Sequence, residues 1–279
     1  MHREHKRTIS IGIIKDMKKC FWALFLTMVP YLLGGNLIFA IITNGNRRFT
    51  DYYEIVASVV NIIVTIITLT VILIFKGYMG KFDLKSFTQG LFVYGLPLVL
   101  FMVYHCVVAI KWIFLDHGTW YPEEFRNIFI MEILYCFTTA AAEEIVFRCG
   151  MLNFLLMGND NVTKKKEVFV CIYSGLLFGI MHLSNIFIDS LDTVLWTILL
   201  GSFIGYVYGI IFLKTKNLPA VVILHAVWDF TAFCNEAMIR EKYRFSGSYN
   251  FMHYQIPIIL IMVIIMTMVL YKSKNEELT

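Results

Sequence analysis

The sequence predicts an all-α membrane protein, a polytopic bundle of about eight transmembrane helices. Of its 279 residues, 58% are hydrophobic and 16% are charged. The mean hydropathy of +0.70 lies well above the values usual for soluble domains. A transmembrane helix needs roughly 20 consecutive apolar residues to cross the hydrocarbon layer. The segments that meet this requirement are 20–42, 54–76, 88–110, 127–148, 168–187, 192–213, 219–236 and 254–271.

Each of these segments is expected to be a helix, because backbone groups in lipid must find their hydrogen-bond partners within the segment. The basic stretch 1–19 is interpreted as a cytoplasmic or interfacial arm. The apolar run after it is too long for the core of a signal peptide, so we expect it to be retained as the first span. Pro219 suits the start of the seventh helix. No repeat or soluble insertion interrupts the sequence, which predicts a single membrane-embedded domain over 1–279.

The distribution of Lys and Arg predicts that both termini lie in the cytoplasm. If the eight segments alternate in direction, sixteen basic residues fall on the side of the N-terminus and seven on the opposite side, with Arg148 set aside as intramembrane. Cytoplasmic loops carry the excess of basic residues. The small excess of 24 Lys and Arg over 20 Asp and Glu fits this role in topology and does not indicate nucleic-acid binding. The expected partner is therefore the lipid bilayer.

Ionisable residues inside the apolar segments are the candidates for function, because each costs about 2.5–3.5 kcal/mol to insert at the membrane centre. The fourth segment ends in TTAAAEEIVFRCG, where Glu144 and Arg148 share a helix face beside Glu143. One carboxylate can pair with the arginine while the other remains available as a base. The three alanines that precede the pair should let another helix approach closely.

Two further segments carry polar groups one helical turn apart. The fifth contains FGIMH, with Phe178 and His182 four residues apart, and the seventh contains HAVWD, with His225 and Asp229 at the same spacing. Such side chains can serve as a general base, as metal ligands or as oxyanion donors. Each alone could be a packing histidine or an interfacial ion pair. Three such segments in a chain otherwise poor in intramembrane charge predict one common site.

Together these motifs resemble those of a known family. EEIVFR (143–148), FGIMH (178–182) and HAVWD (225–229) fit the patterns EExxxR, FxxxH and HxxxN/D in the order of that family. The sequence is similar to the CPBP family, the CAAX-protease and bacteriocin-processing group of intramembrane proteases, also called the Abi family. The resemblance covers residues 127–237, which are expected to form the catalytic helices. It implies a CAAX-protease-like fold and an endopeptidase with a site open toward the cytoplasm.

The resemblance also implies a role for each motif residue. Glu143 would activate the attacking water, and His182 would hold the same water. Glu144 and Arg148 would shape the site and support the base. His225, with the residue four positions later, would stabilise the oxyanion of the tetrahedral intermediate.

The residue four positions later is Asp229, where the prenyl-processing branch has Asn. An ionised Asp cannot donate a hydrogen bond to an oxyanion. It would therefore orient His225, bind a metal or be protonated in its apolar setting. The departure argues against prenylated CAAX substrates. The compact size, the Lys-rich cytoplasmic loops and the lack of added domains resemble the bacterial members, some of which are linked to bacteriocin self-immunity or peptide maturation.

The motifs do not decide whether the site uses a metal ion. The resembling family is usually described as metalloproteases, and a divalent ion such as zinc would take its ligands from His182, His225, Glu143 and Asp229. The same groups could hydrolyse a peptide bond by glutamate chemistry without a metal.

The depth of the motifs raises a geometric difficulty. Glu143, Glu144 and His225 lie within about two turns of the cytoplasmic edge, whereas His182 lies ~20 Å along its segment at 1.5 Å per residue. The fifth helix is therefore expected to begin soon after Lys166, with its first turns beyond the hydrocarbon.

The expected function is that of an intramembrane endopeptidase acting on a peptide or a membrane-anchored protein near the cytoplasmic face of a bacterial plasma membrane. The alternative is a non-proteolytic immunity protein or a proton-coupled transporter, in which the same carboxylates and imidazoles form a relay. Inverted repeats or broken helices would favour the transporter. The sequence indicates neither.

Overall fold

A computed structural model describes most of the chain, and every element in the described residues is helical, with no strand among them. This confirms the predicted all-α class. The arm expected at 1–19 and the first span expected at 20–42 lie outside the described residues, apart from a few single positions. The described ranges are 50–75, 82–111, 122–156, 163–187, 190–242 and 249–272, with Gly80 and seven positions between Lys18 and Tyr31.

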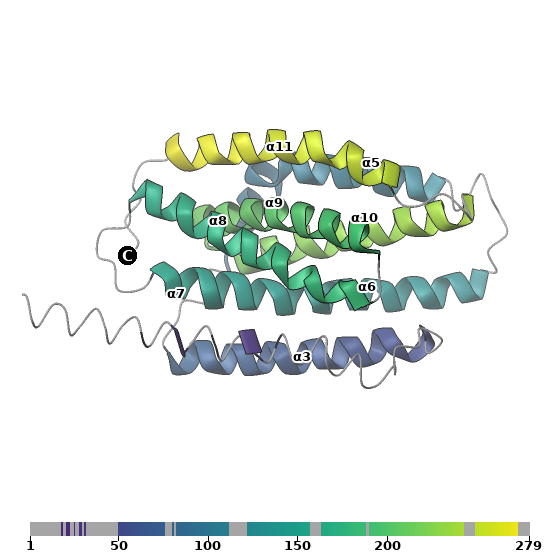
Figure 1. Ribbon diagram of the computed structural model, residues 1–279, viewed down its shortest axis with the longest axis horizontal. Helices are drawn as coiled ribbons and strands as arrows, with labels where there is room; N and C mark the ends of the chain where they lie inside the picture. Colours follow the sequence, from purple (N-terminus) through teal and green to yellow (C-terminus); the bar gives the residue numbers. More distant parts are fainter. Residues whose placement is uncertain are drawn as a thin grey trace, which may run out of the picture.

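The long helices lie side by side along one direction (Figure 1). They are α3 (Thr50–Ile74), α5 (Leu96–Lys111), α6 (Pro122–Glu144), α8 (Lys164–Met181), α9 (Leu191–Thr215), α10 (Leu218–Lys242) and α11 (Tyr249–Lys272). Helix α6 packs against α3 on one side and α10 on the other, while α9 packs against α8 and α11. The alanines Ala140 and Ala142 are fully buried on α6, as expected for a helix that others approach closely.

The fourth predicted span is longer than the sequence suggested. It does not end near residue 148 but continues through a π-helix, η4 (Ile145–Leu152), into α7 (Asn153–Leu156). All eight residues of η4 are buried, so packing favours continuation of the helix through this segment. Glu144 therefore lies about 18 Å from the end of the helical stretch at 1.5 Å per residue, which reduces the expected difference in depth from His182.

The fifth helix begins earlier than its hydrophobic run. Helix α8 starts at Lys164, and the Thr163 side chain caps it by accepting a hydrogen bond from the Lys166 backbone N–H at 3.3 Å. Lys164 and Glu167 form an ion pair of 3.0 Å in the first turn. The polar first turn thus starts two residues before Lys166, and the helix ends where η5 (His182–Phe187), a 3-10 helix, begins.

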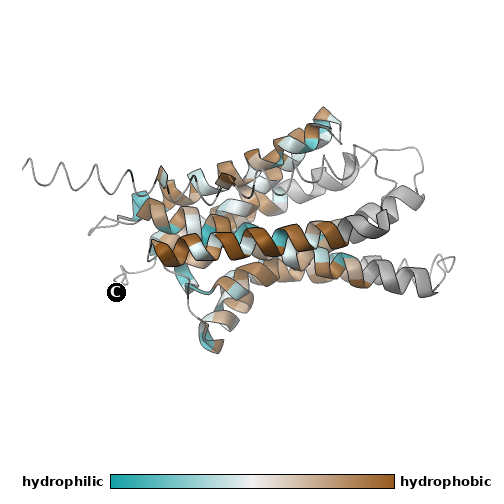
Figure 2. Ribbon diagram, turned by 90° about the horizontal axis from the view of Figure 1, so that it is seen from below, coloured by the Kyte–Doolittle hydropathy of each residue, from teal (hydrophilic) through white to brown (hydrophobic). Residues whose placement is uncertain are grey.

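Hydrophobic residues, brown in Figure 2, run along the helices of the bundle, and many large apolar side chains are exposed. In water such a surface would promote aggregation, whereas in a bilayer it faces lipid. Three described helices are long and apolar enough to cross a membrane, namely Ile55–Ile74, Lys164–Ile186 and Leu191–Thr215, and a bent pair would make a fourth. The chain is therefore a helical membrane bundle, while the predicted number of eight spans stays unconfirmed in the described part.

The third predicted span is broken, contrary to the expectation that no helix is. The segments Leu84–Tyr94, which combines α4 (Leu84–Gln89) with the π-helix η2 (Gly90–Tyr94), and Leu96–Val107 meet at an angle of 71°. Gly95 lies at the bend, and Pro97 follows in the first turn of α5, where its missing N–H cannot continue the preceding hydrogen-bond pattern.

The short limb of this bent pair is fastened to the turn between α9 and α10. The Asn217 side-chain amide donates to the Asp83 carbonyl oxygen at 3.2 Å and to Ser86 Oγ at 2.9 Å. Its side-chain oxygen accepts from the Ala220 backbone N–H at 3.0 Å and so caps α10. Pro219 is the second residue of that helix, which confirms the predicted start.

Helices α8 and α9 approach each other through glycines. A Cβ atom on Gly175 would lie 2.6 Å from the Ser202 carbonyl oxygen and 2.7 Å from the Tyr206 backbone nitrogen. A Cβ atom on Gly179 would overlap the Ile198 carbonyl oxygen. Only glycine allows this backbone approach. The crossing fixes the C-terminal part of α8 and, with it, the residues of the FGIMH motif.

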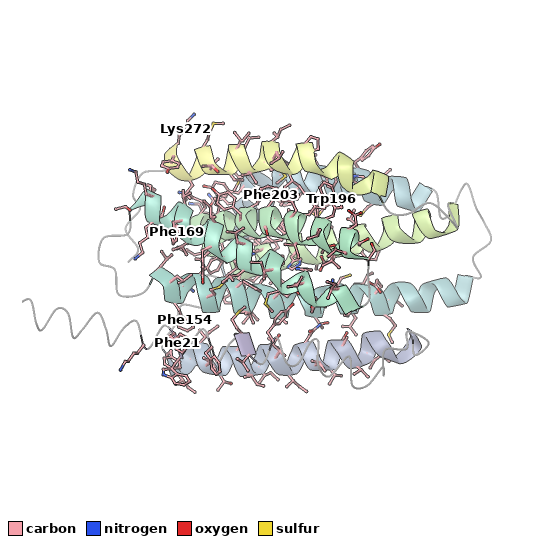
Figure 3. All side chains as sticks on the ribbon, viewed as in Figure 1. Phe21, Phe154, Phe169, Trp196, Phe203 and Lys272 are labelled. Atoms are coloured by element: carbon pink, nitrogen blue, oxygen red, sulfur yellow. The ribbon has the colours of Figure 1, made fainter. Side chains whose placement is uncertain are left out.

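Basic side chains gather at the end of the bundle where α8 begins and α9 and α11 end. Lys272 and Phe169 mark this end in Figure 3. Lys164, at the start of α8, and Lys214, in the last turn of α9, belong to the same end. The placement of this end in the cytoplasm remains a prediction from the positive-inside rule.

Candidate active site

A fully buried ion pair lies at the junction of α6 and η4. Arg148 Nε donates to Glu144 Oε2 at 2.6 Å, and Nη2 donates to Oε1 at 3.4 Å. Arg148 Nη1 donates to Ser174 Oγ on α8 at 3.1 Å, and the guanidinium lies 5.7 Å above the Phe178 ring. Both charged side chains are 0% exposed. The predicted Glu144–Arg148 pairing is present, and it links α6 to α8.

His225 on α10 completes the partners of Glu144. Its Nδ1–H donates to Glu144 Oε1 at 2.9 Å. Its Nε2 lies 3.3 Å from Asp229 Oδ2, one turn later on the same helix, and 3.7 Å from Glu143 Oε2. The HAVWD motif therefore meets the EEIVFR motif directly. Arg148 bonds to both oxygens of Glu144, and His225 bonds to Oε1 as well, which fixes the imidazole in place.

Glu143 is nearly buried and has a partner that the sequence did not indicate. The Tyr31 hydroxyl donates to Glu143 Oε1. The Tyr31 ring contacts the Phe147 ring edge-on at a centroid distance of 6.4 Å, and Phe147 in turn contacts Phe178 at 5.1 Å. Buried tyrosines in apolar segments usually place their hydroxyl on a polar partner, but the sequence does not show which of fifteen tyrosines does so here.

His182 is the first residue of η5 and is half-buried. Its Nδ1 lies 3.0 Å from the Phe178 carbonyl oxygen, an acceptor, so we assign the proton to Nδ1. In this tautomer Nε2 is left as an acceptor. The Phe178 ring lies 5.4 Å from the His182 ring and 5.5 Å from the His225 ring, so it packs between the two histidines.

The three motifs form one cluster. The Phe178 ring contacts the rings of both His182 and His225 and lies under the Arg148 guanidinium, so the FGIMH motif joins the other two. Asp229, with 31% of its side chain exposed, is more open than its partner His225 at 5%. Thus the structure brings together the six side chains that the sequence singled out, from α6 and η4, from the end of α8 and from α10.

The arrangement does not provide a recognisable metal centre among the described side chains. No group of three or more His, Cys, Asp or Glu residues in that part of the chain could hold a metal ion. The Nδ1 atoms of both histidines are already engaged, His225 with Glu144 and His182 with a backbone carbonyl. We therefore derive no reaction step through a metal.

Two further residues complete the surroundings of the site. Ser174 lies one turn before Phe178 on α8 and accepts a hydrogen bond from Arg148. Its i, i+4 spacing from Phe178 could have indicated that it faces the same site. Tyr208 on α9 is fully buried with its ring centroid 5.4 Å from that of His225. Its position in GYVYG, between two glycines of the α8–α9 crossing, was the corresponding signal.

The described site thus consists of two buried glutamates, an arginine bonded to one of them and two histidines, inside a helical membrane bundle. Residues 125–231 match the family model described as Type II CAAX prenyl endopeptidase Rce1-like, so this part of the chain is similar to the CAAX endopeptidases, in line with the resemblance of the three motifs. The matched region contains all six candidate residues. No match was found among curated proteins or among solved structures.

Proposed function

We propose that the protein is an intramembrane endopeptidase that hydrolyses a peptide bond of a peptide or membrane-anchored protein near the cytoplasmic face, with Glu143 as the general base. The observation that carries this proposal is the unequal use of the two glutamates. Glu144 has both oxygens bonded to Arg148 and His225, whereas Glu143 Oε2 lies 3.7 Å from His225 Nε2, beyond hydrogen-bond distance. Glu144 is therefore structural, and Glu143 retains an oxygen for chemistry.

The attacking water is held by two acceptors. One of its hydrogens points to Glu143 Oε2 and the other to His182 Nε2, so the water oxygen presents a lone pair to the carbonyl carbon of the substrate. As the carbon–oxygen bond forms, Glu143 accepts the proton. It then returns the proton to the leaving amine nitrogen as the carbon–nitrogen bond breaks.

His225 stabilises the charge that develops on the carbonyl oxygen. In its protonated form it donates from Nδ1 to Glu144 and has a second donor at Nε2 for the oxyanion. The Glu144–Arg148 pair holds the imidazole in the orientation that this requires. Asp229 accepts from the same Nε2 in the absence of substrate and so orients the ring.

The test is peptide cleavage by purified protein in detergent, with the peptides encoded beside the gene as substrates. Glu143→Gln, His182→Ala and His225→Ala should each lower turnover by a factor of about 10² or more, since each removes a group from the proton-transfer or oxyanion machinery. Glu167→Gln, in the partly exposed first turn of α8, is the matched control and should cleave like the wild type. Unchanged turnover in all three site variants would exclude the proposed peptidase activity at this site.

A second candidate is a binding or transport function, favoured by the bent pair Leu84–Tyr94 and Leu96–Val107. Broken helices form substrate and ion sites in many transporters. In cells, bacteriocin protection that survives the same three substitutions would support binding, whereas protection lost together with peptide cleavage would support proteolysis. The location in a bacterial plasma membrane, with both termini cytoplasmic, belongs to this proposal as well.

A further inference from the structure

We infer that Tyr208 supplies the oxyanion hydrogen bond that the carboxylate of Asp229 cannot donate; this inference rests on the proposed peptidase function. The two residues come from neighbouring helices, α9 and α10, on either side of His225.

The Tyr208 hydroxyl is one of three buried side-chain hydroxyls, with those of Ser58 and Thr68, that have no hydrogen-bond partner in the described part of the chain. Tyr208 is 0% exposed, and its hydroxyl has no hydrogen-bond partner among the residues that the structure describes. A buried hydroxyl left without a partner is destabilising, so each such group in a folded protein calls for an explanation. Of the three, Tyr208 is the one whose ring contacts a residue of the candidate site. A phenol can donate one hydrogen bond. This donor is therefore held ready for an acceptor that arrives from outside the protein.

The position of the ring places this donor in the site. Its centroid lies 5.4 Å from that of His225, with the two planes 36° apart. The ring therefore packs directly against the imidazole that the proposed mechanism uses as an oxyanion donor. Its helix is fixed against α8 by the glycine crossing, which also sets the Phe178 ring beside His225.

The chemistry of the intermediate needs a second donor. When water adds to the peptide carbonyl, the carbonyl π electrons move to oxygen, which becomes negatively charged and favours more than one hydrogen bond. His225 Nε2–H is the first donor in the proposed mechanism, and an ionised Asp229 is only an acceptor. A hydroxyl with no partner in the free enzyme strengthens its interaction as the charge develops, which favours the transition state over the ground state.

A matched control lies two residues away. Tyr206 is on the same helix, but its hydroxyl is hydrogen-bonded to Thr267 Oγ1 on α11 at 2.7 Å. The change Tyr→Phe removes the same atom at both positions. At 206 it breaks a contact between helices, and at 208 it removes a donor without a partner.

The experiment compares Tyr208→Phe and Tyr206→Phe in the full-length protein, with peptide cleavage and thermal unfolding as readouts. Tyr208→Phe should lower kcat by about 10²–10³-fold with little change in KM, the usual effect of losing one oxyanion donor. Its Tm should stay the same or rise, because an unpaired buried hydroxyl is removed. Tyr206→Phe should lower the Tm and leave kcat near the wild-type value. Addition of Asp229→Asn to Tyr208→Phe should restore part of kcat, because the amide is a donor.

The outcomes separate the two proposals. If the wild type does not cleave any peptide while folded, the proposed function fails first. If the wild type cleaves and Tyr208→Phe cleaves equally well, the peptidase stands and the donor role of Tyr208 is wrong. A fall in kcat that is accompanied by an equal loss of folded protein would assign Tyr208 to packing and would also overturn the inference.

Discussion

The Tyr31 hydroxyl donates to the carboxylate of Glu143, although 112 positions separate the two residues in the chain. Glu143 lies inside the region matched by the family model, residues 125–231, and Tyr31 lies far outside it. The first predicted span therefore contributes directly to the candidate base. This contact holds one oxygen of Glu143, and the other oxygen faces His225.

Tyr31→Phe tests how far this contact matters. A hydrogen bond to a charged group contributes about 1.5–3 kcal/mol, so the variant should be less stable by an amount of this order. We expect kcat to fall about tenfold, because the carboxylate is no longer held in one orientation. Tyr173→Phe, on the lipid-facing side of α8, is the control and should change neither quantity. Faster cleavage by Tyr31→Phe would instead show that the hydroxyl blocks the base.

The buried ion pair should dominate local stability. Arg148→Met leaves the Glu144 carboxylate fully buried without its cation, which should cost about 3–5 kcal/mol and lower the Tm in detergent. Replacing both residues, Glu144→Met with Arg148→Met, should recover much of the stability but not the activity. Lys164→Met, which breaks the partly exposed pair with Glu167, should cost about 1 kcal/mol or less. Equal losses in both single variants would contradict the buried arrangement.

The crossing of α8 and α9 should tolerate an added methyl group at one glycine and not at another. Gly179→Ala would force the backbones apart, because its Cβ would overlap the Ile198 carbonyl oxygen. It should reduce the yield of folded protein and displace His182. Gly201→Ala is the matched change on α9, where the nearest atoms would be 3.4 Å and 3.6 Å away. Thermal unfolding of the two variants checks this, and a stable Gly179→Ala protein would refute the close approach.

Chelators should leave cleavage unaffected. Among the described side chains no group of metal-binding residues is arranged to hold an ion, and the proposed step uses Glu143, His182 and His225 without a metal. Activity measured after dialysis against a strong chelator should equal that of untreated enzyme. Loss of activity that zinc restores would show that His182, His225, Glu143 and Asp229 rearrange around a metal in the working enzyme.

Much of the site was predictable because the residues within each motif are close in sequence. The i, i+4 spacings that join Glu144 to Arg148 and His225 to Asp229 are properties of a helix, and the structure contains both pairs. The grouping of three motifs also followed from the energetic cost of isolated charges in a membrane. What spacing alone could not provide is which helices meet, and hence that His225 bonds to the second glutamate and not the first.

The errors of sequence reasoning concern backbone irregularities. The extension of α6 through η4 and α7 depends on burial of every residue in η4, which hydrophobicity alone does not reveal. The bend between Tyr94 and Leu96 depends on a glycine followed by a proline, two residues that membrane helices often tolerate without breaking. Tyr31 and Tyr208 were missed because a tyrosine in an apolar segment has no distinctive pattern.

The π-helix η4 fixes how many residues can separate the two glutamates from Leu152. A π-helix carries more residues per turn than an α-helix, and such insertions occur often at functional sites. Deleting one residue there would allow regular α-helical hydrogen bonding, yet it would rotate everything downstream by about 100° around the helix axis. Arg148 would then point away from Ser174. The segment should accept exchanges of side chains more readily than the gain or loss of a single amino acid.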